Sequence, residues 1–140
     1  MRHHETALER FVSRVSTDDE VLAVIVSGSL ARGEETPSSD IDLYLVVTEP
    51  VWERAMADER IMYVDREDAD YPGGYFDIKL ATLAYLHDAV DHGDDPVRDS
   101  LVNSRVAFTR LPELEQLLAR SGELEDREWQ SRCVSSIAQV

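Results

Sequence analysis

The sequence has almost no cysteine and no long apolar run. Cys133 is the single cysteine among 140 residues, so no disulfide can form within one chain, and we expect a protein of the reducing cytoplasm. The longest strongly apolar run, Val21 to Val26, is far shorter than the about 20 residues that cross a bilayer. The N-terminal residues lack the apolar stretch of a secretory signal. We therefore expect neither a membrane segment nor a targeting segment.

Positive charge is also scarce. Lys and Arg number 14 against 29 Asp and Glu, which gives a formal net charge of −15, and Lys79 is the only lysine. Sequence-independent binding of DNA or RNA needs clustered basic residues, and so does binding to an anionic membrane surface. We therefore expect no nucleic-acid partner and no membrane partner. The charge remains compatible with metal-assisted chemistry, a cationic ligand or a basic protein partner.

The chain has the size and composition of a globular domain, with 43% hydrophobic and 31% charged residues. Apolar periodicity predicts helices and strands that alternate over residues 1–111, which indicates the α/β class. Helices are expected over 4–16, 51–60, 82–92 and 97–102, and strands over 21–26, 40–47, 61–64, 75–80 and 105–109. His3 and His4 precede most of the first helix, and we expect them to be mobile and without a role.

The composition shifts near residue 111, and residues 112–140 are predicted to form a short helical tail. Its last helix is expected over 123–138, with Trp129, Cys133 and Ile137 on one face and Cys133 as a buried small hydrophobe. Such a tail is too short for a complete second domain. We expect it to be the start of a helical domain that is truncated here or completed by a partner chain.

The residues that indicate chemistry are a Gly-Ser pair and three aspartates. Gly28 and Ser29 end a buried strand, Asp40 and Asp42 stand at i and i+2 where the next strand begins, and Asp77 lies on a third strand. Carboxylates at i and i+2 of a strand project from the same face, about 6–7 Å apart along the chain. Carboxylate oxygens on a rigid strand suit Mg²⁺, and a third carboxylate can complete a site for two ions.

The Gly-Ser pair has a complementary role in this prediction. Gly28 lacks the side chain that would block a phosphate from approaching the backbone, and Ser29 offers a hydroxyl and an N–H group to an anion. At this composition, Gly-Ser followed ten residues later by Asp-x-Asp arises by chance about once in two hundred such chains. A turn followed by a pair of solvated carboxylates is therefore the weaker interpretation.

The segment from Val26 to Val47 reads VSGSLARGEETPSSDIDLYLVV. It resembles the signature of the DNA polymerase β-like nucleotidyltransferase superfamily, which combines Gly-Ser, Ala-Arg-Gly and Ser-Asp-Ile-Asp-Leu. The resemblance covers about residues 5–110. It implies the nucleotidyltransferase fold, a mixed twisted sheet flanked by helices, and a cytoplasmic transferase that binds a nucleoside triphosphate, with ATP expected, and two Mg²⁺ ions.

The resemblance also implies a role for each site residue. Asp40 and Asp42 would bind both metal ions, and Asp77 would be a third metal ligand and a candidate general base. The resemblance implies that Gly28 and Ser29 bind the triphosphate. We also assign to the nucleotide-binding set Arg32, which could approach a phosphate, and Lys79, which shares a strand face with Asp77. The reaction would be in-line attack of an acceptor hydroxyl on the α-phosphorus with release of pyrophosphate.

The acceptor stays open in the sequence. The leading hypothesis is a hydroxyl of a small molecule, as in the antibiotic nucleotidyltransferases. The alternatives are a minimal nucleotidyltransferase antitoxin that adenylylates a partner toxin protein, and a catalytically silent nucleotide-binding module. The short tail leaves little of the chain to build an acceptor site, so we expect a protein partner or a homodimer to complete it. The charge of −15 disfavours a nucleic-acid polymerase.

Overall fold

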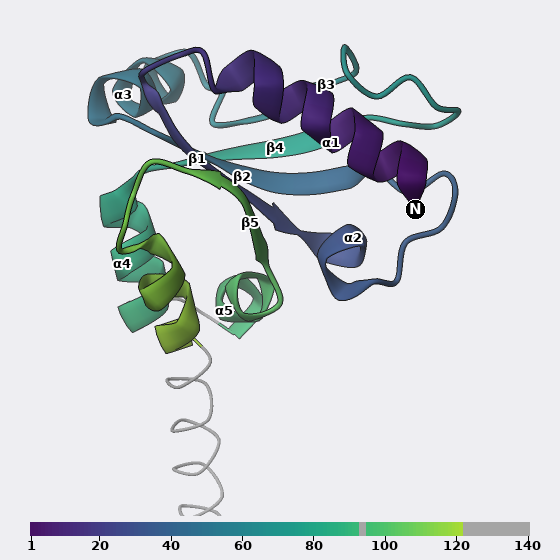
Figure 1. The fold of residues 1–140 in the computed structure, drawn as a ribbon. Coiled ribbons are helices and arrows are strands. Elements are labelled where there is room, and N and C mark those ends of the chain that lie inside the picture. Colours follow the sequence, from purple (N-terminus) through teal and green to yellow (C-terminus); the bar gives the residue numbers. More distant parts are fainter. Residues whose placement is uncertain (93–94, 122–140) are drawn as a thin grey trace, which may run out of the picture.

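The computed structural model describes residues 1–92 and 95–121 of the chain (Figure 1). In chain order the elements are α1 (Arg2–Val15), β1 (Val21–Ser27), α2 (Gly28–Arg32), β2 (Ile41–Val47), α3 (Glu49–Ala57), β3 (Met62–Asp65), β4 (Phe76–Ala81), α4 (Leu83–His92), α5 (Asp95–Val102) and β5 (Arg105–Thr109). Residues 114–121 are also helical.

The strands form one five-stranded sheet in the order β3-β4-β2-β1-β5. β2 and β4 pair in parallel, whereas the β1–β2, β1–β5 and β3–β4 pairs are antiparallel. The chain therefore has the mixed sheet with flanking helices that the sequence predicts. The two central strands, β1 and β2, are buried along almost their whole length. Their continuous apolar runs fit strands that are covered on both faces.

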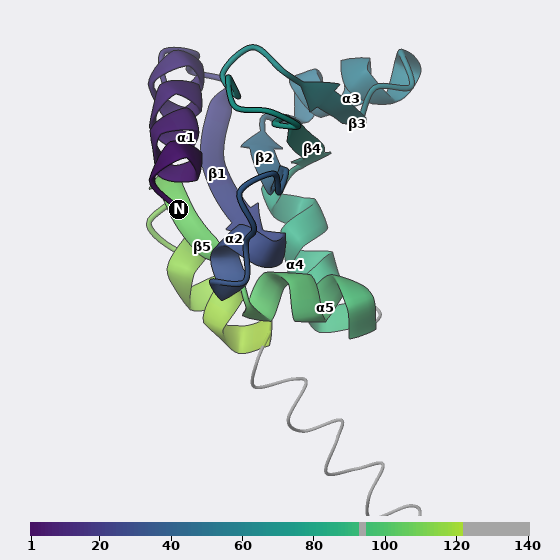
Figure 2. The same cartoon turned by 90° about the vertical axis from the view of Figure 1, so that its right-hand side faces the viewer.

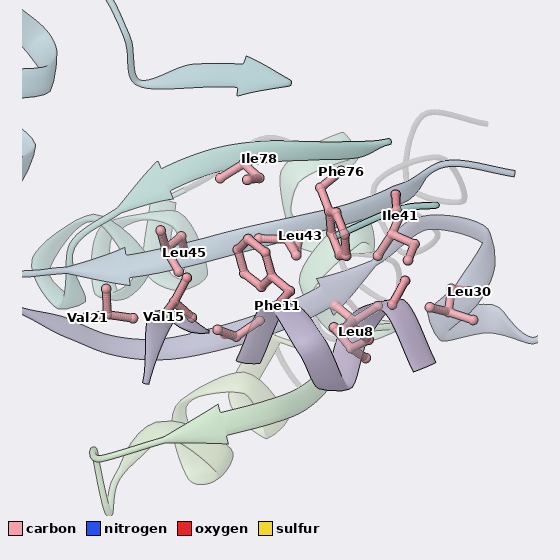
Figure 3. Close-up of a cluster of buried hydrophobic side chains, with 14 of the residues drawn as sticks. Leu8, Phe11, Val15, Val21, Leu30, Ile41, Leu43, Leu45, Phe76 and Ile78 are labelled. Atoms are coloured by element: carbon pink, nitrogen blue, oxygen red, sulfur yellow. The ribbon is translucent and has the colours of Figure 1, made fainter. Parts of the chain in front are cut away.

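Helix α1 covers one face of the sheet (Figures 1 and 2). Figure 3 shows its side chains directed at those of the strands, and the ring of Phe11 stacks on that of Phe76 with 4.8 Å between the ring centroids. The largest contributors to this first core include Leu8, Phe11, Ile41, Leu43, Phe76 and Ile78. Spacings of three and four residues on α1 and of two on β2 and β4 bring these side chains to one layer.

A second core lies on the opposite face of the sheet, under α4, α5 and the helical residues 114–121 (Figure 2). Leu114, Leu117 and Leu118 are buried there together with Leu86 and Leu101. Residues 114–121, the first turns of the predicted tail, thus pack onto the sheet. A domain boundary near residue 111 stays a prediction. The expected helix over 123–138, with Trp129, Cys133 and Ile137, lies outside the described residues.

The predicted helices and strands of the first 111 residues are confirmed, with ends shifted by a few residues. The largest shift is in α3, predicted over 51–60 and found over Glu49–Ala57. Pro50 occupies the first turn, where a missing N–H costs nothing, so the helix begins before it. The helix ends early because Glu59 adopts a left-handed φ of +56°. Among the described residues, no helix combines the length and the apolar character needed to cross a bilayer.

We expect Phe11→Ala to lower the free energy of unfolding by about 3–5 kcal/mol, the usual cost of emptying a fully buried aromatic site. Phe11 is 1% exposed, and the substitution also removes its stacking contact with Phe76. Urea denaturation measures the change. Met56→Ala is the control, because Met56 is 47% exposed and its removal should cost no more than about 0.5 kcal/mol. Equal losses for the two variants would contradict the core described above.

Candidate active site

Three carboxylates converge at one end of the parallel pair β2 and β4. One oxygen each of Asp40, Asp42 and Asp77 lies within 4.8 Å of the other two. Asp42 on β2 stands directly opposite Asp77 on β4 in the parallel register, and Asp40 immediately precedes β2 on the same face as Asp42. All three side chains are half-buried. The sequence prediction that these residues form one group is confirmed.

The electrostatics of this group fit a divalent cation. Burial raises the pKa of Asp42 to about 6, and repulsion by the carboxylates of Asp40 and Asp77 adds to the increase. Lys79 acts in the opposite direction. Carboxylate oxygens are hard ligands of the kind that Mg²⁺ and Mn²⁺ prefer, and a cation among them would relieve their repulsion. The residues present therefore suit the metal that the resemblance implies.

Gly28 lies against the carboxylate of Asp42. It is the first residue of α2, has a left-handed φ of +67°, and a Cβ added to it would lie 2.2 Å from Oδ2 of Asp42. Ser27, the residue before it, pairs with Asp42 in the β1–β2 register. The sequence analysis explained this glycine by the approach of a phosphate. The structure adds a requirement of its own, because any larger side chain would displace a proposed metal ligand.

A pocket of about 270 Å³ opens beside these residues. Its lining contains Ser27 and four of the predicted site residues, which are Gly28, Arg32, Asp42 and Lys79. Ser29, Asp40 and Asp77 do not line it. Ser29 lies in α2, where its carbonyl accepts a hydrogen bond from the N–H of Glu34 at 2.9 Å. The structure thus brings most, but not all, of the predicted nucleotide-binding residues to one pocket.

The two cations of the pocket differ in their partners. The guanidinium of Arg32 is 3.1 Å from the carboxylate of Glu34. Lys79 is exposed and has no ion pair with any described residue, and its Nζ lies 5.8 Å from the ring centroid of Tyr44. A lysine beside Asp42 that forms no ion pair within the described residues suits an anionic ligand that enters with its own metal ion.

Helix α5 supplies two pocket residues that the sequence analysis did not identify, Asp99 and Ser100. The Ser100 hydroxyl is 3.4 Å from the hydroxyl of Tyr44 on β2. The carboxylate of Asp99 accepts a hydrogen bond from the side-chain amide of Asn103 at 3.3 Å. No motif marks these two positions, since they reach the pocket only through the packing of α5 against the second face of the sheet.

The family profile described as "Nucleotidyltransferase domain" matches residues 8–108 of the chain. That range contains Gly28, Ser29 and the three clustered aspartates. No curated protein matches the sequence significantly.

Two solved structures are similar to this chain. A chain of a crystal structure described as a toxin–antitoxin with AMP-PNP has a TM-score of 0.46 and 10% identity, with 95% of this chain and 98% of that chain covered. A chain of a mutant of the toxin–antitoxin MntA-HpeT has the same TM-score and coverage and 9% identity.

We expect Gly28→Ala to destabilise the protein more than Gly33→Ala. Both glycines are left-handed, at +67° and +71°, so alanine costs about 1–2 kcal/mol at either position. Only at Gly28 would the new methyl group collide with Asp42, whereas nothing lies within 4 Å of a Cβ at Gly33. Overpacking typically adds about 1–3 kcal/mol. Urea denaturation of both variants measures the difference, and equal losses would show that Asp42 does not depend on Gly28.

We expect Asp42→Asn to raise the melting temperature of the metal-free protein at neutral pH. The pKa of Asp42 is about 6 in the folded protein and has an ordinary value of 3.8. The folded state therefore binds more protons than the unfolded state between about pH 4 and pH 6, and ionisation of Asp42 weakens folding as the pH rises through this range.

Thermal melts in EDTA across this range measure the effect. The advantage of Asp42→Asn over wild type should be small near pH 4 and largest above pH 6. Asp19→Asn, which changes an exposed aspartate before β1, is the control and should show no such profile. A variant that melts no higher than wild type at neutral pH would argue against repulsion within the carboxylate group.

Proposed function

Since the chain belongs to the nucleotidyltransferase domain family, we propose that it transfers AMP from ATP to a hydroxyl group and releases pyrophosphate. The observation that carries this proposal is the convergence of Asp40, Asp42 and Asp77 within 4.8 Å, beside a pocket lined by Arg32 and Lys79. Carboxylates that hold metal ions and cations that face phosphate are the two requirements of transfer at an α-phosphorus.

The roles of the residues follow from their positions. Asp40, Asp42 and Asp77 would hold two Mg²⁺ ions. When bound, Mg²⁺ lowers the pKa of an acceptor hydroxyl and neutralises charge on the triphosphate. The backbone at Gly28 and Ser29 would contact the triphosphate, and Lys79 and Arg32 would balance its charge. This chain contributes chiefly position and charge rather than a covalent intermediate.

The acceptor oxygen forms a bond to the α-phosphorus as the bond from that phosphorus to the bridging oxygen of the β-phosphate breaks. Pyrophosphate leaves with the electron pair of the broken bond. Asp77, the third carboxylate of the group, is the proposed acceptor of the hydroxyl proton.

For the acceptor we propose a hydroxyl on a basic protein partner, which corresponds to the antitoxin hypothesis. The pocket of about 270 Å³ is smaller than the roughly 300–1,000 Å³ typical of sites that enclose a small ligand. The acceptor would then stand largely outside it, as a side chain on another protein does. A net charge of −15 would draw a basic partner.

A small-molecule acceptor is the second candidate, and the lining of the pocket favours it. Asp99 and Ser100 add a carboxylate and a hydroxyl to the lining that contains Lys79, and such groups orient a polar or cationic small molecule. The two candidates differ in the size of the product that carries AMP.

Radioactive ATP tests the proposal. With Mg²⁺ and separate protein and small-molecule fractions of a cell extract, label from the α-phosphate should appear on an acceptor, while label from the γ-phosphate should not. Asp40→Asn is the blank. Label in the protein fraction supports the antitoxin hypothesis, and label in the small-molecule fraction supports the second candidate. Label from the γ-phosphate on the acceptor, or no label from either position, would refute nucleotidyl transfer.

A further inference from the structure

Asp40 lies just outside β2, so the hydrogen bonds of the sheet do not fix it directly. The backbone is nevertheless held on both sides of this residue. After it, the N–H of Ile41 donates to the carbonyl of Tyr75 at 3.0 Å. Before it, the carbonyl of Ser39 accepts two hydrogen bonds, one from Nε2 of His4 at 3.1 Å and one from the hydroxyl of Tyr71 at 2.8 Å.

His4 belongs to the first turns of α1, far from Ser39 in sequence, and its side chain is 0% exposed. Because Nε2 faces a carbonyl oxygen, this nitrogen carries the proton and donates. Burial, and then the neighbouring His3, lower the pKa of His4, which favours this neutral form. Its other ring nitrogen has no hydrogen-bond partner among the described residues. Within the described part of the chain, the bond to Ser39 is thus the one hydrogen bond that offsets the burial of this imidazole.

Tyr71 reaches the same carbonyl from the segment between β3 and β4. Its ring meets the ring of His4 edge-on, with 4.9 Å between centroids. Gly74 makes room for it, since a Cβ at that position would lie 2.8 Å from the ring. The ring of Tyr71 therefore lies between His4 of α1 and Gly74 of its own loop, and its hydroxyl points toward Ser39.

The rest of the α2–β2 loop is tied to the same end of α1, which lies beside it in Figure 1. Nε2 of His3 hydrogen-bonds the carbonyl of Pro37 at 2.8 Å. The amino group of Met1 forms an ion pair with Glu35. The expectation that the two histidines are mobile and without a role is wrong for His4, which is fully buried, and both rings contact this loop.

We propose that His4 and Tyr71 are positioning residues that set the geometry of Asp40 for metal binding by holding the carbonyl of Ser39. The inference rests on the proposed function, because it assigns these residues to the metal site. They touch neither nucleotide nor metal and act through the one peptide unit that joins Ser39 to Asp40. An anchor for α1 alone would need no donor aimed at the residue next to a metal ligand.

Binding of Mn²⁺ by the protein, measured as the loss of the free Mn²⁺ signal in electron paramagnetic resonance, tests this role. Mn²⁺ takes the same oxygen ligands as Mg²⁺. Tyr71→Phe removes one donor and keeps the ring, and His4→Leu removes the other. Each should weaken Mn²⁺ binding about three- to tenfold, which corresponds to the loss of one hydrogen bond. His4→Gln keeps an N–H donor at similar reach and should bind within about twofold of wild type.

Two controls separate positioning from a general loss of stability. Tyr63→Phe makes the same chemical change on β3, where the hydroxyl has no hydrogen bond with a described residue, and should bind Mn²⁺ like wild type. Asp42→Asn sets the background from the acidic surface. Thermal melts confirm that each variant is folded at the temperature of the titration, and if His4→Leu does not fold, Tyr71→Phe decides.

The proposal is overturned if Tyr71→Phe binds Mn²⁺ as tightly as wild type. It is also overturned if His4→Gln loses as much affinity as a folded His4→Leu, because the imidazole would then matter only for packing. Wild-type protein that binds no more Mn²⁺ than Asp42→Asn would remove the metal site itself, and with it both this proposal and the proposed function. Unchanged variants beside a wild type that binds would remove the positioning role alone.

Discussion

The parallel pairing of β2 and β4 is the interaction on which the site depends. It sets Asp42 opposite Asp77, and the same register sets Ile41 opposite Phe76 and Leu43 opposite Ile78 beneath α1. A slip of β2 by one residue would turn Asp42 toward the core beneath α1 and would turn Ile41 and Leu43 toward the pocket. The burial of large apolar side chains on one face therefore fixes the position of the charges on the other. Among the described residues, the carboxylate group has no scaffold separate from this core.

The same register brings carboxylates that repel one another close together. Three half-buried carboxylates share a small volume, and the raised pKa of Asp42 is the result. The two cores compensate, because β2, which carries Asp42, is buried along almost its whole length, and the apolar side chains of β4 face the first core. Sites of this kind are stable only where the surrounding structure determines them fully. Gly28 belongs to the same compromise, because the carboxylate of Asp42 occupies the space that a Cβ at this position would need.

Much of this could be predicted from the sequence because the signals are local. Continuous apolar runs predicted β1 and β2, alternation placed Asp40 and Asp42 on one face, and the spacing from Gly28 indicated a phosphate and metal site. Asp99 reaches the pocket only because α5 packs on the second core, which periodicity does not reveal. The contacts of His4 and Tyr71 join segments that are distant in sequence, and a histidine near a terminus resembles a mobile one until the loop beside it is placed. Their hydrogen bonds follow from the tertiary fold rather than from any motif.

The few basic residues of this acidic chain are often paired with acids at its surface. Many of the described arginines are engaged with acids at the surface, for example Arg10 with Asp70, Arg14 with Asp65 and Asp68, Arg105 with Glu5, and Arg120 with Asp91. Exposed pairs of this kind contribute little stability, but each removes a cation that could otherwise attract polyanions.

Lys79 is left beside the carboxylates without an ion pair to a described residue. A bare triphosphate would meet a repulsive surface, whereas a triphosphate that carries Mg²⁺ presents cations to the three aspartates and oxygens to Lys79. Under the proposed function, the acidic surface would therefore favour the metal-bound nucleotide and a basic acceptor over a bare triphosphate or a polyanion. Because surface potentials of this kind are screened within about 8–10 Å at physiological salt, both preferences should weaken as ionic strength rises.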